Sequence, residues 1–224
     1  MFEGTSVEDN IGSRELGFSK EFLISVLDHS TFISHISVAS NHAVRNLSEA
    51  GFTVRNVNGN PVISELIKSP PTTSLESMER SFTSSIPMYR TGLPEDGFFP
   101  GIVALIHSHP YHPNRDSAVK ALTPSQYDLE EWEELKITMK NKNLIMGILA
   151  TDRFTSKLIL IQDDPNREQN THYQQWDEQS DSADELLRLL QKSGKRYEIL
   201  NFNLKTKQFQ EEDKTRIGNL ATVF

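Results

Sequence analysis

The sequence contains no cysteine among its 224 residues. This absence excludes disulfide bonds within the chain and zinc sites built from thiolates. Any metal held by its side chains must therefore be bound by histidine and carboxylate. Long apolar runs are also missing, and none approaches the roughly 20 residues that a helix needs to cross a bilayer. We expect no membrane partner, and the first residues show no basic segment followed by an apolar one that would indicate a signal peptide.

Basic residues are fewer than acidic ones: the sequence has 23 Lys and Arg residues and 31 Asp and Glu residues, which gives a formal net charge of −8. A negatively charged protein is repelled by phosphate backbones, so the composition argues against nucleic acid as a partner. It is compatible with a cytoplasmic protein that meets neutral or basic protein surfaces. The length allows one domain with a sizeable core, with or without an appendage.

Alternating helical and strand patterns indicate the α/β class, with a mixed central β-sheet flanked by helices. Residues 1–17 are expected to form a flexible N-terminal segment. The acid-rich stretch that starts at residue 163 is expected to be a loop, followed by a C-terminal helix and strand up to residue 224 that are packed on or appended to the domain. We expect helices near residues 18–27, 32–47, 74–85, 125–142 and 182–193, and strands near residues 48–54, 61–67, 102–106, 143–151, 157–162 and 197–204.

The most informative stretch begins with the apolar run Ile102–Ile106, which is typical of a buried strand. His107-Ser108-His109-Pro110 follows at once. Alternate residues of a strand point to the same face, so His107 and His109 can direct two imidazoles at one point. Pro110 lacks a backbone donor and is expected to end the strand pairing.

A second polar motif, Ser125-x-x-Asp128, follows after fourteen further residues. It has the form of a helix capping box, with serine as the N-cap and an acid at the third helical position, and this interpretation needs no metal. Asp128 at a helix start would nevertheless provide a third ligand beside the two histidines. Three protein ligands and a water in the fourth position make up a catalytic tetrahedral zinc site.

The order of these motifs, an apolar strand, H-x-H-P, a loop and S-x-x-D opening an acidic helix, resembles the JAMM (MPN-type) zinc metalloproteases. The resemblance implies that His107, His109 and Asp128 hold one zinc ion per chain, and that Ser125 helps to stabilise the oxyanion. It covers residues 18–162 and implies a catalytic domain with the MPN/JAMM-like α/β sandwich. The implied activity is deubiquitinase-like: hydrolysis of isopeptide or peptide bonds at the C-terminus of ubiquitin or a ubiquitin-like or sulfur-carrier protein. Whether a partner subunit is required stays open.

By the same resemblance, Glu49 is the catalytic glutamate, because the family places this residue at the start of a strand after a first helix. The family has its glycine one residue further along than Gly51, and a register shift of one residue moves a side chain to the other face of a sheet. A hairpin through Asn58-Gly59 would set Glu65 roughly opposite Glu49. Glu65 is therefore a rival candidate for the catalytic base.

The segment Tyr111–Thr123 is the largest departure from the family, since it doubles the usual gap between the two motifs. A loop can bulge away from a metal at small entropic cost, so we expect a mobile loop at the mouth of the site. His112 in this loop is a candidate spare ligand.

The histidines His29, His35 and His42 do not follow the three- or four-residue spacing of one helix face and are expected on the surface or at helix flanks. The alternative function is a non-catalytic MPN-type scaffold for protein interaction. Such relatives are expected to lack the ligands that are present here.

Overall fold

The computed structural model describes residues 18–69, 101–109, 121, 123–151, 155–171 and 182–220. Several predicted features lie outside these ranges: the N-terminal segment, the helix near residues 74–85, Pro110, and most of the segment Tyr111–Thr123 with His112. The two motifs that carry the candidate site, apart from Pro110, lie within them.

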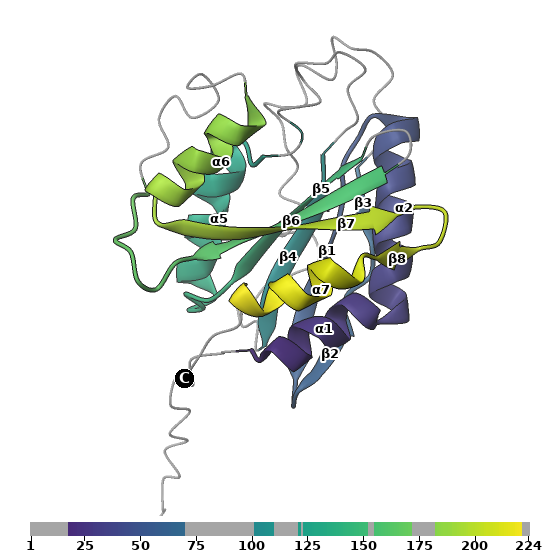
Figure 1. Ribbon diagram of the computed structural model, residues 1–224, viewed down its shortest axis with the longest axis horizontal. Helices are drawn as coiled ribbons and strands as arrows, with labels where there is room; N and C mark the ends of the chain where they lie inside the picture. Colours follow the sequence, from purple (N-terminus) through teal and green to yellow (C-terminus); the bar gives the residue numbers. More distant parts are fainter. Residues whose placement is uncertain are drawn as a thin grey trace, which may run out of the picture.

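An eight-stranded mixed sheet forms the centre of the described chain (Figure 1). Its strands follow the order β2-β1-β4-β5-β6-β7-β8, and the short β3 also pairs with β1. Strands β4 and β5 are parallel, and the other paired strands are antiparallel. The strands are β1 (Ala50–Val57), β2 (Asn60–Ile63), β3 (Ile67–Lys68), β4 (Ile102–Ser108), β5 (Ile145–Thr151), β6 (Thr155–Asp163), β7 (Lys195–Asn203) and β8 (Gln208–Phe209).

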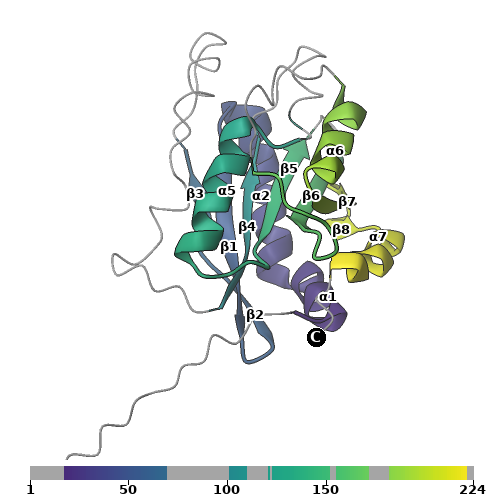
Figure 2. The same cartoon turned by 90° about the vertical axis from the view of Figure 1, so that its left-hand side faces the viewer.

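Helices cover both faces of this sheet, which confirms the predicted general α/β class. Helices α1 (Lys20–Asp28) and α2 (Ser30–Asn46) lie on one side, and α5 (Gln126–Thr138) and α6 (Ala183–Lys192) lie on the other (Figure 2). The short α7 (Glu211–Arg216) and the 3-10 helix η2 (Ile217–Leu220) follow near α1.

Each face of the sheet packs into its own apolar core. On β5, Ile145 and Leu149 belong to the core under α1 and α2, whereas Met146 and Ile148 belong to the core under α5 and α6. This alternation follows from the two-residue period of a strand. Because both faces are covered, β4 and β5 are apolar along most of their length.

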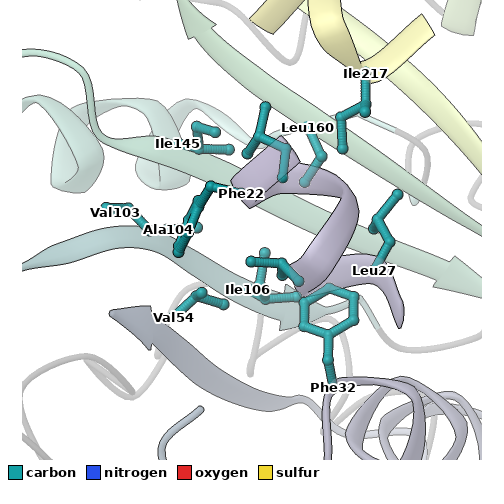
Figure 3. A pocket seen from close by; sticks show the side chains of 12 residues that line it. Phe22, Leu27, Phe32, Val54, Val103, Ala104, Ile106, Ile145, Leu160 and Ile217 are labelled. Carbon is teal, nitrogen blue, oxygen red and sulfur yellow. The ribbon is translucent and has the colours of Figure 1, made fainter. Parts of the chain in front are cut away.

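A small cavity of about 20 Å³ lies in the core under α1 (Figure 3). Only apolar side chains line it, among them Phe22 from α1, Ile106 from β4 and Ile217 from η2. Cavities without polar partners hold no ordered water, so this one is a packing defect of the core and offers no chemistry.

The first hairpin forms as predicted but is irregular beyond its turn. Asn58 and Gly59 have φ angles of 53° and 86°, as a two-residue turn between twisted strands requires. The strand predicted to continue to Ile67 is interrupted, because β2 ends at Ile63 and β3 resumes at Ile67. Three residues there oppose two residues of β1, which is a β-bulge.

The residues after Asp163 continue the central sheet. Strand β7 pairs with β6 from Thr155↔Asn203 to Asp163↔Lys195. Helix α6 forms where predicted, with the Ser182 hydroxyl accepting from the Glu185 amide and Gly194 adopting a φ of 79° just after the helix.

Among the described helices, none is by itself both long and apolar enough to cross a membrane. Helices α1 and α2 are long and apolar enough for a membrane span only when they are counted as one segment. The chain bends by 61° at the break between them.

Candidate metal site

Strand β4 brings the two histidines of the H-x-H motif to one edge of the sheet. His107 pairs with Gly51 of β1 on one side and with Ile148 of β5 on the other. The His109 amide continues this pairing by donating to the Leu149 carbonyl at 3.0 Å. Both side chains lie on the face that α5 covers, and only 3% of His107 and 6% of His109 is exposed.

Helix α5 begins next to these histidines, and its predicted capping box is present. The Ser125 hydroxyl accepts from the Asp128 amide at 3.1 Å, and the Asp128 carboxylate accepts from the Ser125 amide at 2.8 Å. The Ser125 hydroxyl also donates to Oδ2 of Asp128 at 2.8 Å. The cap therefore orients the carboxylate, and the helix N-terminus favours its negative charge.

The potential ligand atoms of His107, His109 and Asp128 converge. The two Nε2 atoms are 3.0 Å apart, and they lie 3.3 Å (His107) and 3.2 Å (His109) from the two carboxylate oxygens of Asp128. Nitrogen and oxygen ligands of a tetrahedral zinc ion, each about 2.0–2.1 Å from the metal, are about 3.3 Å from one another. This buried group could hold a metal ion, as the sequence predicts.

The electrostatics of the group also fit a cation. Burial disfavours the charged form of His107, but the carboxylates of Asp128, Glu49 and Glu131 outweigh this effect and raise its pKa. Burial likewise opposes ionisation of Asp128, but His107 and His109 hold the pKa of this carboxyl well below its usual range. Two neutral imidazoles with both Nε2 lone pairs facing each other would repel. A metal ion or a proton between them removes this repulsion.

Glu49 lies beside this group, immediately before β1. The pairing of Gly51 with His107, continued by two residues along each strand, sets Glu49 opposite His109 on the same sheet face. Burial raises the pKa of the half-buried Glu49 carboxyl; His107 and His109 oppose this rise, and Asp128 adds to it.

Glu65 does not share this position. The prediction that it lies roughly opposite Glu49 is wrong, because the carbonyl of Glu49 instead accepts from the Ser69 amide at 2.9 Å. Glu65 is exposed in the bulge between β2 and β3, and β1 lies between that bulge and β4. Its distance from Glu49 follows from the length of the hairpin, which sets Lys68 opposite Ala50.

His42 is a further correction, since it is buried and not at the surface. Only 8% of it is exposed, and its ring contacts Asn46, Ser48 and the Ser69 carbonyl. His29, at the junction of α1 and α2, and His35, on α2, are half-buried, in line with the predicted helix-flank positions. Of the contacts that His42 makes, only the one with Asn46 could be expected from the sequence, because the two residues are four positions apart on one helix.

Comparisons of the chain with models of protein families, with curated proteins and with solved structures found no match.

Proposed function

We propose that this protein is a zinc-dependent metallopeptidase of the JAMM (MPN) type. Its proposed reaction is hydrolysis of isopeptide or peptide bonds at the C-terminus of ubiquitin or of a ubiquitin-like or sulfur-carrier protein. The observation that carries the proposal is the convergence of one ligand atom each from His107, His109 and Asp128, all within 4.8 Å of one another. The mixed sheet with helices on both faces is compatible with the MPN fold, which forms part of the proposal.

The proposed roles follow from where each side chain lies. His107, His109 and Asp128 would hold one zinc ion, which supplies a nucleophilic water and polarises the scissile carbonyl. Glu49 takes a proton from the attacking water and delivers it to the leaving amine. The direction of its pKa shift suits this exchange, because a carboxyl with a raised pKa is both a competent base and a competent acid closer to neutral pH.

Ser125 has two tasks in this proposal. In the structure its hydroxyl donates to Asp128, so it positions a metal ligand. To donate to an oxyanion, the hydroxyl must turn from Asp128 towards the substrate. The Ser125 amide keeps its own hydrogen bond to Oδ2, so Asp128 stays anchored during that rotation.

The kind of substrate and the cellular location are also part of the proposal. A net charge of −8 suits a protein substrate with a neutral or basic surface better than a nucleic acid. A cytoplasmic location suits a chain without cysteine whose metal ligands are imidazole and carboxylate.

The proposal is tested by cleavage of ubiquitin-like fusion proteins and of ubiquitin dimers of different linkage. We expect hydrolysis after the C-terminal residue of the ubiquitin fold, loss of turnover after treatment with a chelator, and recovery on addition of Zn²⁺. His107→Ala is expected to be inactive under all these conditions. A zinc-loaded protein that cleaves none of these substrates would contradict the proposed reaction and favour the scaffold function. Cleavage that persists in the chelator-treated protein would contradict the role of zinc.

A further inference from the structure

The backbone around Glu49 is held by three different elements of the fold. The side chain of Ser48 contacts His42 of α2, the carbonyl of Glu49 accepts from Ser69, and the amide of Ala50 donates to the Ser108 hydroxyl of β4. From this arrangement we infer that His42 is a positioning residue, which acts through Ser48 to fix Glu49 beside the metal ligands. The inference rests on the proposed function in one respect, the role of Glu49 as the base.

The hydrogen bonds around His42 form a chain with one consistent direction. The Asn46 side-chain nitrogen lies 2.6 Å from Nδ1 of His42, and an amide nitrogen can only donate. The Ser69 carbonyl near Nε2 can only accept, so both contacts fit the tautomer in which Nδ1 is the acceptor and Nε2 carries the ring proton. This proton faces the Ser48 hydroxyl at 2.8 Å, while the Ser69 carbonyl lies 3.2 Å from Nε2 and 3.4 Å from the same hydroxyl.

Burial and charge keep this chain intact. His42 is 8% exposed and Ser48 is 5% exposed, so loss of one partner would leave a buried polar group without a hydrogen bond. Burial lowers the pKa of His42, the Ser69 carbonyl opposes this, and the positive charge of Lys68 lowers it further. The neutral ring that results is the form that can accept from Asn46.

The donor and acceptor roles in this hydrogen-bond chain argue against a nucleophilic role for Ser48. A serine, a histidine and an asparagine in hydrogen-bonding distance have the composition of a catalytic triad. In a triad, however, the histidine nitrogen that faces the nucleophile must accept its proton. Here Nε2 already carries a proton, so the Ser48 hydroxyl donates elsewhere and the group serves to hold the backbone.

Ser108 holds the opposite side of the same segment. Its hydroxyl accepts from the Ala50 amide at 3.0 Å, and both residues are fully buried. Because Ser108 stands between His107 and His109, this bond ties Glu49 to the strand that carries two of the metal ligands. A general base must be held within about 0.5 Å of its productive position, so removal of either anchor is expected to slow turnover.

Hydrogen exchange tests the inference without any measurement of activity. We would record exchange of the Ser69 and Ala50 amides by NMR in the metal-free and Zn²⁺-loaded protein, for wild type, His42→Phe and Ser48→Ala. The matched control is Ser40→Ala, which removes an equally buried hydroxyl of α2 that bonds Ser156 at 2.8 Å. We expect exchange of these two amides to accelerate about tenfold in Ser48→Ala and His42→Phe, as loss of one net hydrogen bond predicts, and to stay unchanged in Ser40→Ala.

Kinetics on a cleavable ubiquitin-like fusion provide the second measurement. We expect Ser48→Ala and His42→Phe to lower kcat by about 10- to 100-fold at unchanged KM and unchanged zinc content, because only the base is displaced. His42→Gln keeps a donor near the position of Nε2 and is expected to restore part of kcat. Unchanged amide exchange, or a Ser48→Ala variant that matches Ser40→Ala in both exchange and kcat, would overturn the inference. If wild type cleaves no substrate, the proposed reaction fails and the exchange result alone decides whether His42 holds this segment.

Discussion

Glu49 is the residue whose proposed role depends most directly on the register of β1 and β4. It stands opposite His109 in the extended register of β1 and β4, and the charges of all three proposed ligands act on its carboxyl. Glu49→Gln should therefore retain zinc and the fold but lose nearly all hydrolysis, because an amide cannot accept the proton of the attacking water. Turnover and metal content measured on the same preparation would test this.

The matched control is Glu65→Gln, which neutralises an exposed glutamate in the adjacent bulge. This variant should remain active. An inactive Glu65→Gln beside an active Glu49→Gln would assign the base to Glu65 and contradict the register argument.

Ser125 is a second residue whose two roles can be separated. As an oxyanion donor, its replacement by alanine should lower kcat by roughly 10²–10³-fold. As a helix cap, the same change should lower the free energy of unfolding by about 1 kcal/mol. We expect both losses, and a Ser125→Ala variant with full activity and a lowered Tm would restrict Ser125 to the cap.

At the scale of elements, α5 is attached to the sheet by a buried ring of charges. Lys195, which is fully buried at the start of β7, contacts Glu133 and Asp163 at 2.7 Å each. Lys136 bridges the same two carboxylates at 2.7 and 2.6 Å. The ring joins α5 to β6 and β7, so β7 supports the helix whose first turn carries Asp128.

Removal of Lys195 should leave two partly buried carboxylates that share a single positive charge, that of Lys136. We expect Lys195→Met to lower the free energy of unfolding by about 3–5 kcal/mol, as measured by chemical denaturation. The control Lys157→Met removes an exposed lysine from β6 and should change stability by less than about 0.5 kcal/mol. Similar losses in both variants would show that the ring contributes little.

The ring also predicts how stability depends on pH. Burial alone would raise the pKa of Glu133, but hydrogen bonds from Lys136 and Lys195 outweigh burial and lower it. A group whose pKa is lower in the folded than in the unfolded state stabilises the fold above its unfolded pKa, about 4.3, and this contribution is lost as the pH falls through the folded pKa. Wild type should therefore lose stability more steeply than Glu133→Gln below about pH 4.3. Parallel curves for the two proteins would contradict this.

The elements show which parts of the site could be predicted from sequence. The capping box of α5 and the shared face of His107 and His109 depend on residues within four positions of each other, and both form as predicted. The contact of His42 with Ser69 spans 27 residues and was missed, because no local pattern reports a partner at that distance. The bulge around Glu65 was missed for a related reason. The extra residue opposite β1 is defined only once β3 pairs with β1, and no local pattern indicates where that pairing resumes.

At the scale of the whole molecule, three segments far apart in sequence meet at one edge of the sheet. The residue Glu49 just before β1, the end of β4 and the start of α5 converge there. A metal bound between β4 and α5 crosslinks two elements that the unfolded chain does not hold together. Zinc is thus expected to stabilise the fold by mass action, by about 2.7 kcal/mol at a hundredfold excess over Kd.

Thermal unfolding with and without Zn²⁺ checks this expectation. Chelator-treated wild type should show a lowered Tm that rises again with added Zn²⁺. Asp128→Ala should have the same Tm in both conditions, and a Zn²⁺-dependent rise of equal size in that variant would indicate that the stabilising ion binds elsewhere.

The most direct test of the central claim is the zinc content of the purified protein, measured by elemental analysis for wild type and for His107→Ala and Asp128→Ala. The ligand geometry predicts about one zinc per wild-type chain and almost none in either variant, with circular dichroism showing that both variants stay folded. Full zinc occupancy in a folded His107→Ala or Asp128→Ala protein, or a wild-type protein that binds no zinc, would contradict the site proposed for this chain.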